Sequence, residues 1–120
     1  MATMDDKDAF MMLREMQVKY SSAVNALNQM ESVKRQHEIS LRRAAFTATQ
    51  LDAMPEDTTT YAAVGKAYVL TPKADIMASL EAGIKTADAE LKAVASKKTA
   101  LASTVSQLEE DMDRLVKNQS

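Results

Sequence analysis

Two long segments with the apolar spacing of coiled-coil helices flank a short segment with the pattern of strands. In the second long segment, apolar residues recur at alternating intervals of three and four, the spacing of a coiled-coil seam. This seam comprises Ile76, Leu80, Ile84, Ala87, Leu91, Val94, Lys98, Leu101, Val105, Leu108, Met112 and Leu115. Lys98 is its only charged member. The pattern predicts a helix over residues 73–117.

The first long segment has the same spacing in a less regular form. Its seam begins with Phe10, Leu13, Gln17, Tyr20, Val24 and Leu27. After Leu27 the same frame falls on charged residues, so the seam has to shift onto Met30, Val33 or His37 before Leu41 restores it. We therefore expect a helix over residues 5–53 with a stutter or a loosened stretch in its seam.

The segment between them, residues 54–72, changes to a strand pattern. Its β-branched, aromatic and apolar residues are Thr58, Thr59, Thr60, Tyr61, Val64, Tyr68, Val69, Leu70 and Thr71. Gly65 divides this set, which predicts a short β-hairpin that turns near Gly65. A two-stranded hairpin is marginally stable by itself, and its edges are unpaired. We therefore expect it to need strands from other chains.

Helices of similar length on either side of a reversing hairpin are expected to pack antiparallel. The predicted fold is mainly α: a single domain over residues 1–120, built as an antiparallel two-helix coiled coil. The hairpin would lie at one end and both termini at the other. Pairing Leu51 with about Ala74 would place Phe10 and Leu13 near Met112 and Leu115.

Composition excludes several classes of protein. The chain has 120 residues, 4% of them aromatic, with no Trp and no Cys, which leaves little material for a compact core and none for disulfides or thiolate chemistry. No apolar run approaches the length of about 20 residues that spans a membrane, and Asp5, Asp6 and Asp8 do not suit a signal peptide. The net charge of −2 gives no attraction to nucleic acid or acidic lipid. We expect a cytoplasmic protein without membrane or nucleic-acid partners.

The methionines are unevenly placed. The antiparallel arrangement would gather six of the nine at the free end, namely Met1, Met4, Met11, Met12, Met16 and Met112. Flexible thioether side chains adapt to many shapes, so this end could bind unfolded or variable partners. The alternative is structural: Met1 is the initiator, and Met16 and Met112 are seam residues.

No other group of residues points to catalysis. His37 has no partner one helical turn away that would support a metal or acid–base role. A basic cluster could contact phosphates but is more typical of a solvated helix face, and it consists of Lys34, Arg35, Arg42 and Arg43. The acidic run Glu109–Asp111 is also expected to be solvated, or to attract basic segments of a partner. We predict no enzyme activity and no cofactor or metal.

The run PEDTTTYAAVGKAYVLTPKADIMASL, residues 55–80, resembles the central signature of β-type prefoldin subunits. The shared features are an acidic turn, a Tyr, two further residues, Val-Gly, an alternating apolar strand, and a Thr with a Lys that opens the second helix. The helix–hairpin–helix layout extends the resemblance over nearly the whole chain.

The resemblance implies a heterohexamer of two α-type and four β-type subunits, with a double β-barrel formed by the hairpins and six projecting coiled coils. It implies capture of unfolded actin and tubulin at the ends of the coiled coils and their delivery to the cytosolic chaperonin without ATP. The implied assembly residues are Tyr61, Val64, Gly65, Tyr68, Val69 and Leu70. The implied client-binding residues are Phe10, Met11, Met12, Leu13, Met112 and Leu115. The chain departs from the family pattern at Ala62, Ala63, Ala67 and Gly83.

The sequence therefore favours a subunit of an ATP-independent chaperone that holds unfolded proteins. A structural coiled-coil subunit of a cytoskeletal or tethering complex is the alternative, with the hairpin serving only as a connector. A regulator that binds nucleic acid through the basic cluster is a third possibility.

Overall fold

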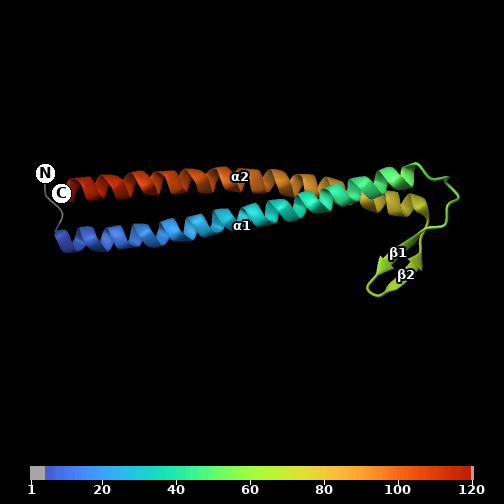
Figure 1. Ribbon diagram of the computed structural model, residues 1–120, viewed down its shortest axis with the longest axis horizontal. Coiled ribbons are helices and arrows are strands. Elements are labelled where there is room, and N and C mark those ends of the chain that lie inside the picture. Colours follow the sequence, from blue (N-terminus) through green and yellow to red (C-terminus); the bar gives the residue numbers. More distant parts are fainter. Residues whose placement is uncertain (1–4, 120) are drawn as a thin grey trace. The chain divides into compact units, whose positions relative to one another are not determined.

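Two long helices are joined by a β-hairpin in the computed structural model, which describes residues 5–119 (Figure 1). Helix α1 spans Asp6–Asp52, strand β1 Tyr61–Val64, strand β2 Ala67–Leu70 and helix α2 Lys73–Gln119. The predicted fold class is confirmed. The packing divides the chain into two compact units: unit 2 is Lys34–Ala93, and unit 1 comprises the described residues up to Val33 and from Val94 onward. That the chain forms a single domain stays a prediction.

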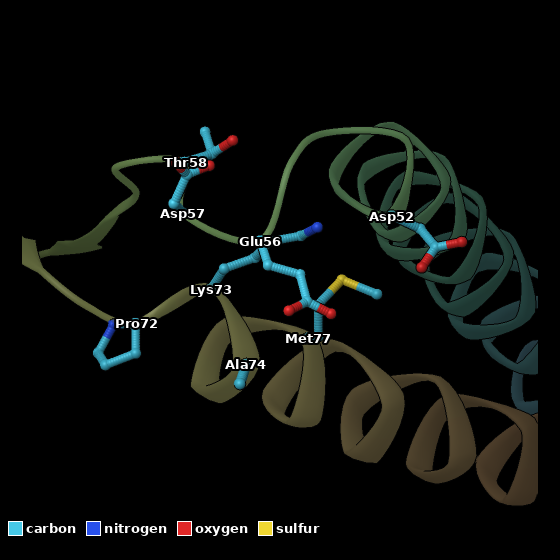
Figure 2. Close-up of a pocket in the computed structure, with 8 residues that line it drawn as sticks. All are labelled: Asp52, Glu56, Asp57, Thr58, Pro72, Lys73, Ala74 and Met77. Atoms are coloured by element: carbon cyan, nitrogen blue, oxygen red, sulfur yellow. The ribbon is translucent and has the colours of Figure 1, made fainter.

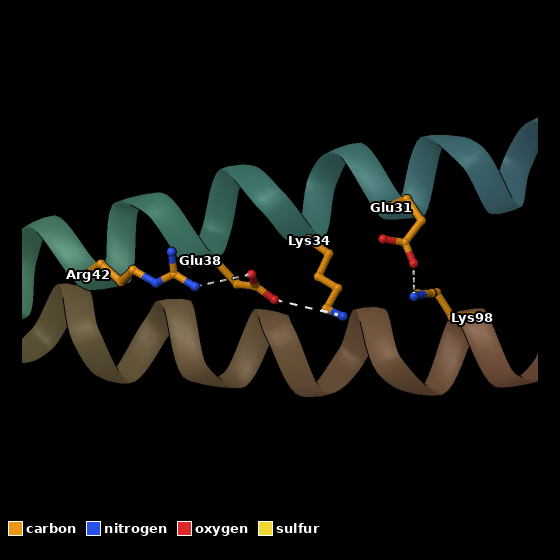
Figure 3. A network of polar contacts seen from close by, with 5 residues as sticks. All are labelled: Glu31, Lys34, Glu38, Arg42 and Lys98. Atoms are coloured by element: carbon orange, nitrogen blue, oxygen red, sulfur yellow. Dashed lines mark hydrogen bonds and ion pairs between the residues drawn. The ribbon is translucent and has the colours of Figure 1, made fainter.

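In unit 1, two contacts between α1 and α2 show that the helices are antiparallel. The Tyr20 hydroxyl donates a hydrogen bond of 3.0 Å to Glu109 Oε1, and the Lys98 ammonium pairs with Glu31 (Figure 3). Glu31 lies eleven residues after Tyr20, and Lys98 lies eleven residues before Glu109. The two helices therefore keep one register between these contacts.

Unit 2 has the same antiparallel arrangement. His37 Nδ1 lies 3.0 Å from Glu90 Oε2, and Lys73 Nζ donates a hydrogen bond of 2.7 Å to the carbonyl of Met54. Met54 follows His37 by seventeen residues, and Lys73 precedes Glu90 by seventeen. The last turn of α1 contains no basic residue, so the Lys73 ammonium supplies the positive charge that a helix C-terminus favours.

The hairpin is an antiparallel pair with a two-residue turn. Its register pairs Tyr61 with Leu70, Ala62 with Val69, Ala63 with Tyr68 and Val64 with Ala67. Gly65 has a φ of 61°, and no other described residue has a positive φ, which matches a type II′ turn with glycine in its first central position. Thr60 and Thr71 close the base, since the Thr71 N–H donates to the Thr60 carbonyl at 3.0 Å and the Thr60 hydroxyl donates to the Thr71 carbonyl at 2.5 Å.

The junction of hairpin and helices contains a pocket of about 570 Å³ (Figure 2). It lies between the end of α1, the turn that leads to β1 and the first turns of α2, and it is lined by Asp52, Glu56, Asp57, Thr58, Pro72, Lys73, Ala74 and Met77. Its carboxylates come from residues that are exposed to solvent. Among the described side chains that line the pocket, only that of Lys73 makes a hydrogen bond or ion pair, so the lining does not form a chemical site.

The predicted seam of α2 is confirmed by burial. Each of its twelve positions is buried or half-buried, and most of the intervening residues are exposed. Ala87 and Val94 are the most buried of them, with 8% and 6% of their surface exposed. The spacing found in the sequence therefore identifies the packed face of α2 in both units.

The seam of α1 is different from the prediction at every second position. Phe10 is 62% exposed and Gln17 is also exposed, whereas the neighbouring Ala9 and Met16 face the seam. The buried and half-buried residues at alternating spacings of four and three are Ala9, Leu13, Met16, Tyr20, Ala23, Leu27 and Met30 in unit 1, and Lys34, His37, Leu41, Ala44, Ala48 and Leu51 in unit 2. This spacing is unbroken, so the expected stutter is wrong.

The physical reason is side-chain size. Ala9 and Ala23 are the two buried residues of α1, with 6% and 8% of their surface exposed. Small side chains let two helices approach closely, and the closest approach excludes the most water. The predicted seam took the larger Phe10 and Val24 in place of these alanines, so it was one residue too far along the chain at those two positions.

Replacing the two glycines by alanine should have opposite effects on stability: Gly65→Ala should destabilise the hairpin turn, and Gly83→Ala should stabilise α2. In Gly65→Ala, a φ of 61° would hold a side chain in the left-handed region, which costs about 1–2 kcal/mol. In Gly83→Ala, nothing lies within 4 Å of the added Cβ, and the gain in helix propensity is about 1 kcal/mol. Hydrogen exchange of the β1 and β2 amides should accelerate in Gly65→Ala, and the urea midpoint should rise in Gly83→Ala. Unchanged exchange in Gly65→Ala would show that the turn does not depend on the positive φ.

Lys98 allows a second test, because its half-buried ammonium occupies a seam position beside Glu31. Lys98→Met should stabilise the fold by about 1 kcal/mol, since an apolar side chain of similar length has no charge to desolvate. Glu31→Gln should destabilise it by about 1 kcal/mol, because the ammonium loses a charged partner. Urea unfolding followed by circular dichroism measures both. A Lys98→Met chain less stable than the natural one would show that the ion pair contributes more than apolar packing.

Candidate assembly and client-binding surfaces

The β-hairpin exposes apolar side chains on both of its faces. Residues directly opposite each other in an antiparallel pair share a face. The register therefore puts Tyr61, Tyr68 and Leu70 on one face and Val64 and Val69 on the other. These five residues, which we call the hairpin surface, are between 49% and 77% exposed. The described residues of the chain cover neither face.

All six predicted assembly residues are thus found in the hairpin, five on its faces and Gly65 in its turn. Lys66, also in the turn, is the only charged residue between Tyr61 and Leu70. Ala62, Ala63 and Ala67, where the chain departs from the family pattern, add little apolar area between the larger side chains. The hairpin surface is accordingly apolar and uncharged over its whole length.

The six predicted client-binding residues belong to two different environments in unit 1. Phe10, Met11 and Met12 are exposed, by 62%, 55% and 40%. The remaining three are half-buried in the seam: Leu13, Met112 and Leu115. Met16 is also a half-buried seam residue, while Met1 and Met4 lie outside the described residues. Three of the six are therefore available to a partner without opening the seam.

In unit 1, two exposed apolar residues were not identified from the sequence. Val18 is 66% exposed and Val116 52% exposed. Val18 lies seven residues, or two helical turns, after Met11, and both line a shallow groove of about 420 Å³. Arg14, Glu15 and Lys19 complete its lining. The spacing of seven on the side away from the seam was the available signal. We call Phe10, Met11, Met12, Val18 and Val116 the terminal surface.

Polar contacts fix the acidic run near the end of α2. Glu109 accepts the hydrogen bond of Tyr20, and Asp111 accepts one of 3.0 Å from Gln107 Nε2. The hydrogen bond to Glu109, together with the charge of that carboxylate and partial burial, raises the pKa of Tyr20. Two of the three carboxylates of the run are thus engaged within unit 1 rather than simply solvated.

His37 is paired with a carboxylate of the other helix, which the sequence around His37 does not indicate. It is half-buried in the seam of unit 2, and its ring nitrogen meets Glu90 of α2. A residue 53 positions away in the sequence lies outside any search one turn up or down the helix. Among residues 5–119, no group of three or more His, Cys, Asp and Glu side chains could hold a metal ion. His37 makes a polar contact between the two helices of unit 2.

The basic cluster is partly paired within unit 2. Glu38 lies between Lys34 and Arg42 on α1, with N–O distances of 3.8 and 3.9 Å (Figure 3). In the described part of the chain, Arg35 and Arg43 make no ion pair.

Neither helix contains a stretch long and apolar enough to cross a membrane over the residues described.

Comparisons with known proteins agree with this architecture. The prefoldin subunit family matches residues 14–119. Prefoldin subunit 1 of Arabidopsis thaliana is 28% identical over 99% of this chain and 91% of its own, and the probable prefoldin subunit 1 of Dictyostelium discoideum is 23% identical over 93% and 95%. The crystal structure of the prefoldin beta subunit from Thermococcus strain KS-1 shares the fold, with a TM-score of 0.76 at 20% identity over 95% of this chain and 96% of that one. The chain therefore belongs to the prefoldin subunit family, whose members are non-enzymatic subunits of a hetero-oligomeric chaperone.

Proposed function

We propose that this chain is a β-type subunit of a cytoplasmic prefoldin heterohexamer that captures unfolded actin and tubulin. In this proposal its hairpin completes a β-barrel shared with α-type and β-type subunits. Its terminal surface binds the unfolded client, and the hexamer delivers the client to the cytosolic chaperonin without ATP.

The observation that carries the proposal is the double-sided hairpin surface. A hairpin that packed on its own helices would need apolar residues on one face only. This hairpin has them on both faces and also leaves its strand edges unpaired. Strands from neighbouring subunits would satisfy both needs, because they pair with the edges while their side chains cover the faces. Burial of one large apolar side chain contributes about 1.5–3 kcal/mol, so this set can support a stable assembly.

The terminal surface supports the client-binding part. Its residues are apolar and exposed, its two methionines are flexible, and the groove lined by Met11 and Val18 is bordered by charges of both signs. Mixed charge does not select for one sign in the bound segment, which suits unfolded proteins of varied sequence. Each contact is weak, but six tethered chains in one hexamer would act at high effective concentration and hold the client by their sum.

A structural coiled-coil subunit is the second candidate. The regular seams of α1 and α2 would serve such a role equally well, and the hairpin would then be a connector. The two candidates differ in one consequence: only the chaperone requires the hairpin surface for assembly.

Assembly should depend on both faces of the hairpin. Tyr68→Asp and Val69→Asp each put a carboxylate on a different face, where it would be desolvated in a barrel. We expect the pair of substitutions to weaken incorporation into the hexamer by at least about 100-fold. Native mass spectrometry of the chain, co-expressed with an α-type subunit and the other β-type subunits, measures this as loss of the two-to-four complex.

Lys66→Asp is the matched control, because it introduces the same residue in the same hairpin but in the solvent-exposed turn. The helicity of all variants should match that of the natural chain. Full incorporation of the Tyr68→Asp and Val69→Asp chain would contradict the chaperone assembly and favour the structural candidate.

Client capture should depend on the terminal surface. We expect Phe10→Ser combined with Met11→Ser and Val18→Ser to weaken binding of unfolded actin by about 5- to 10-fold, since one of six chains loses its apolar contacts. The assay is suppression of actin aggregation by stoichiometric hexamer. Phe46→Ser is the matched control: Phe46 is on the same helix and is 67% exposed, against 62% for Phe10. Equal loss of suppression in both would show that any exposed Phe serves, and that the terminal surface is not the binding site.

A further inference from the structure

A second exposed surface lies on α1 within unit 2, on the side of the helix away from the seam. It consists of Arg35, Ile39, Arg42, Arg43 and Phe46, and we call it the arginine face. Ile39 and Phe46 are 53% and 67% exposed. They are seven residues apart, so they lie about two turns or roughly 10 Å from each other along the same line of the helix. The geometry of the helix puts Arg35 and Arg42 on one flank of that line and Arg43 on the other.

The three charged residues that make up this face are all arginines. The other residues of unit 2 that helical spacing places on it are polar and uncharged: Gln36, Thr49 and Gln50. The nearest carboxylate, Glu38, is 3.9 Å from Arg42 (Figure 3). The Arg42 side chain is 80% exposed, and an exposed ion pair of this length contributes little. All three guanidinium groups can therefore turn to a partner at small energetic cost.

We propose that the arginine face binds an acidic amphipathic helix of a partner protein. An apolar side chain of that helix would pack between Ile39 and Phe46, and carboxylates on either side of it would pair with the arginines. Arginine suits this role because its planar guanidinium binds a carboxylate through two parallel hydrogen bonds. The arrangement is that of an amphipathic helix laid on a complementary helical surface, with apolar residues inside and charges at the rim.

Nucleic acid fits this face less well. Three arginines could contact phosphates, but the centre of the face is an aliphatic side chain and a single aromatic ring. Proteins that bind single strands present several aromatic side chains on which successive bases stack. A phosphate backbone would also leave Ile39 and Phe46 without an apolar partner. The proposed role is independent of client capture, because the terminal surface belongs to unit 1 and has mixed charge.

The test uses a fluorescent synthetic helix with a leucine stripe flanked by glutamates, added to the assembled hexamer. Fluorescence anisotropy should show saturable binding that weakens as salt increases. Replacing all three arginines by Gln should weaken it at least about 10-fold, because charge-assisted hydrogen bonds are lost. Ile39→Ser with Phe46→Ser should weaken it by a similar factor. Peptides with lysines in place of the glutamates, or serines in place of the leucines, should not bind.

The matched control variant neutralises three exposed lysines of α2, Lys85, Lys92 and Lys97, by the same change to Gln. It alters the net charge equally and should keep full affinity. Equal loss of affinity in the control and the arginine variant would overturn the proposal, since binding would then follow net charge alone. Binding of a single-stranded oligonucleotide in preference to the acidic helix would overturn it in favour of nucleic acid. Loss of the hexamer in the arginine variant, with no peptide binding to the natural hexamer, would identify the face as a contact between subunits.

Discussion

The constraint on which the molecule depends is that two strands cannot bury both of their own faces. In most small antiparallel sheets one face packs on a core and the other is solvated. In the hairpin surface Tyr68 and Leu70 occupy one face and Val69 the other, and the described residues of the chain cover neither. The backbone hydrogen bonds that a single hairpin can make are already formed, with a type II′ turn at Gly65 and the hydrogen bonds between Thr60 and Thr71 at its base. The described residues leave both faces open, and in the proposed assembly strands of other chains would cover them.

The helices solve a simpler problem, and small and polar residues decide how they do it. Ala9, Ala23 and Ala87 allow close approach, so the packing is tight where side chains are short. The seam also contains Lys98 and His37, each paired with a carboxylate from the other helix. Such pairs add little stability compared with apolar residues, but they are satisfied in one register only. Apolar positions make the helices pack, and the polar positions determine which residues face each other.

Much of this organisation could be predicted from the sequence. The hairpin turn, the strand residues and the whole seam of α2 follow from spacing and turn chemistry, because each depends on residues close together in the chain. The seam of α1 could be predicted only in part, because Phe10 is larger and more apolar than Ala9 and was therefore chosen as the seam residue, although Ala9 occupies that position. The Glu90 partner of His37 also depends on residues brought together across the helix pair, whereas the exposure of Val18 follows from its place on the side of α1 away from the seam. The spacing of apolar residues identifies the buried face of a helix directly. Exposed functional residues can be identified only as the apolar residues that do not belong to the seam.

The same distinction separates the two exposed phenylalanines of α1. Phe10 has Asp6 and Lys7 one turn before it and Arg14 one turn after, so its surroundings favour neither sign of charge. Phe46 follows Arg42 and Arg43 by one turn, and the residues one turn after it, Thr49 and Gln50, are uncharged. If exposed apolar area alone determined binding, Phe10 and Phe46 would bind unfolded chains equally well. The charges around them differ, and since a rim of one charge sign repels partners of the same sign, the proposed site at Phe46 would be selective where the proposed site at Phe10 would not. One helix can therefore present a general apolar contact and a selective one, because discrimination comes from the arginines and not from the rings.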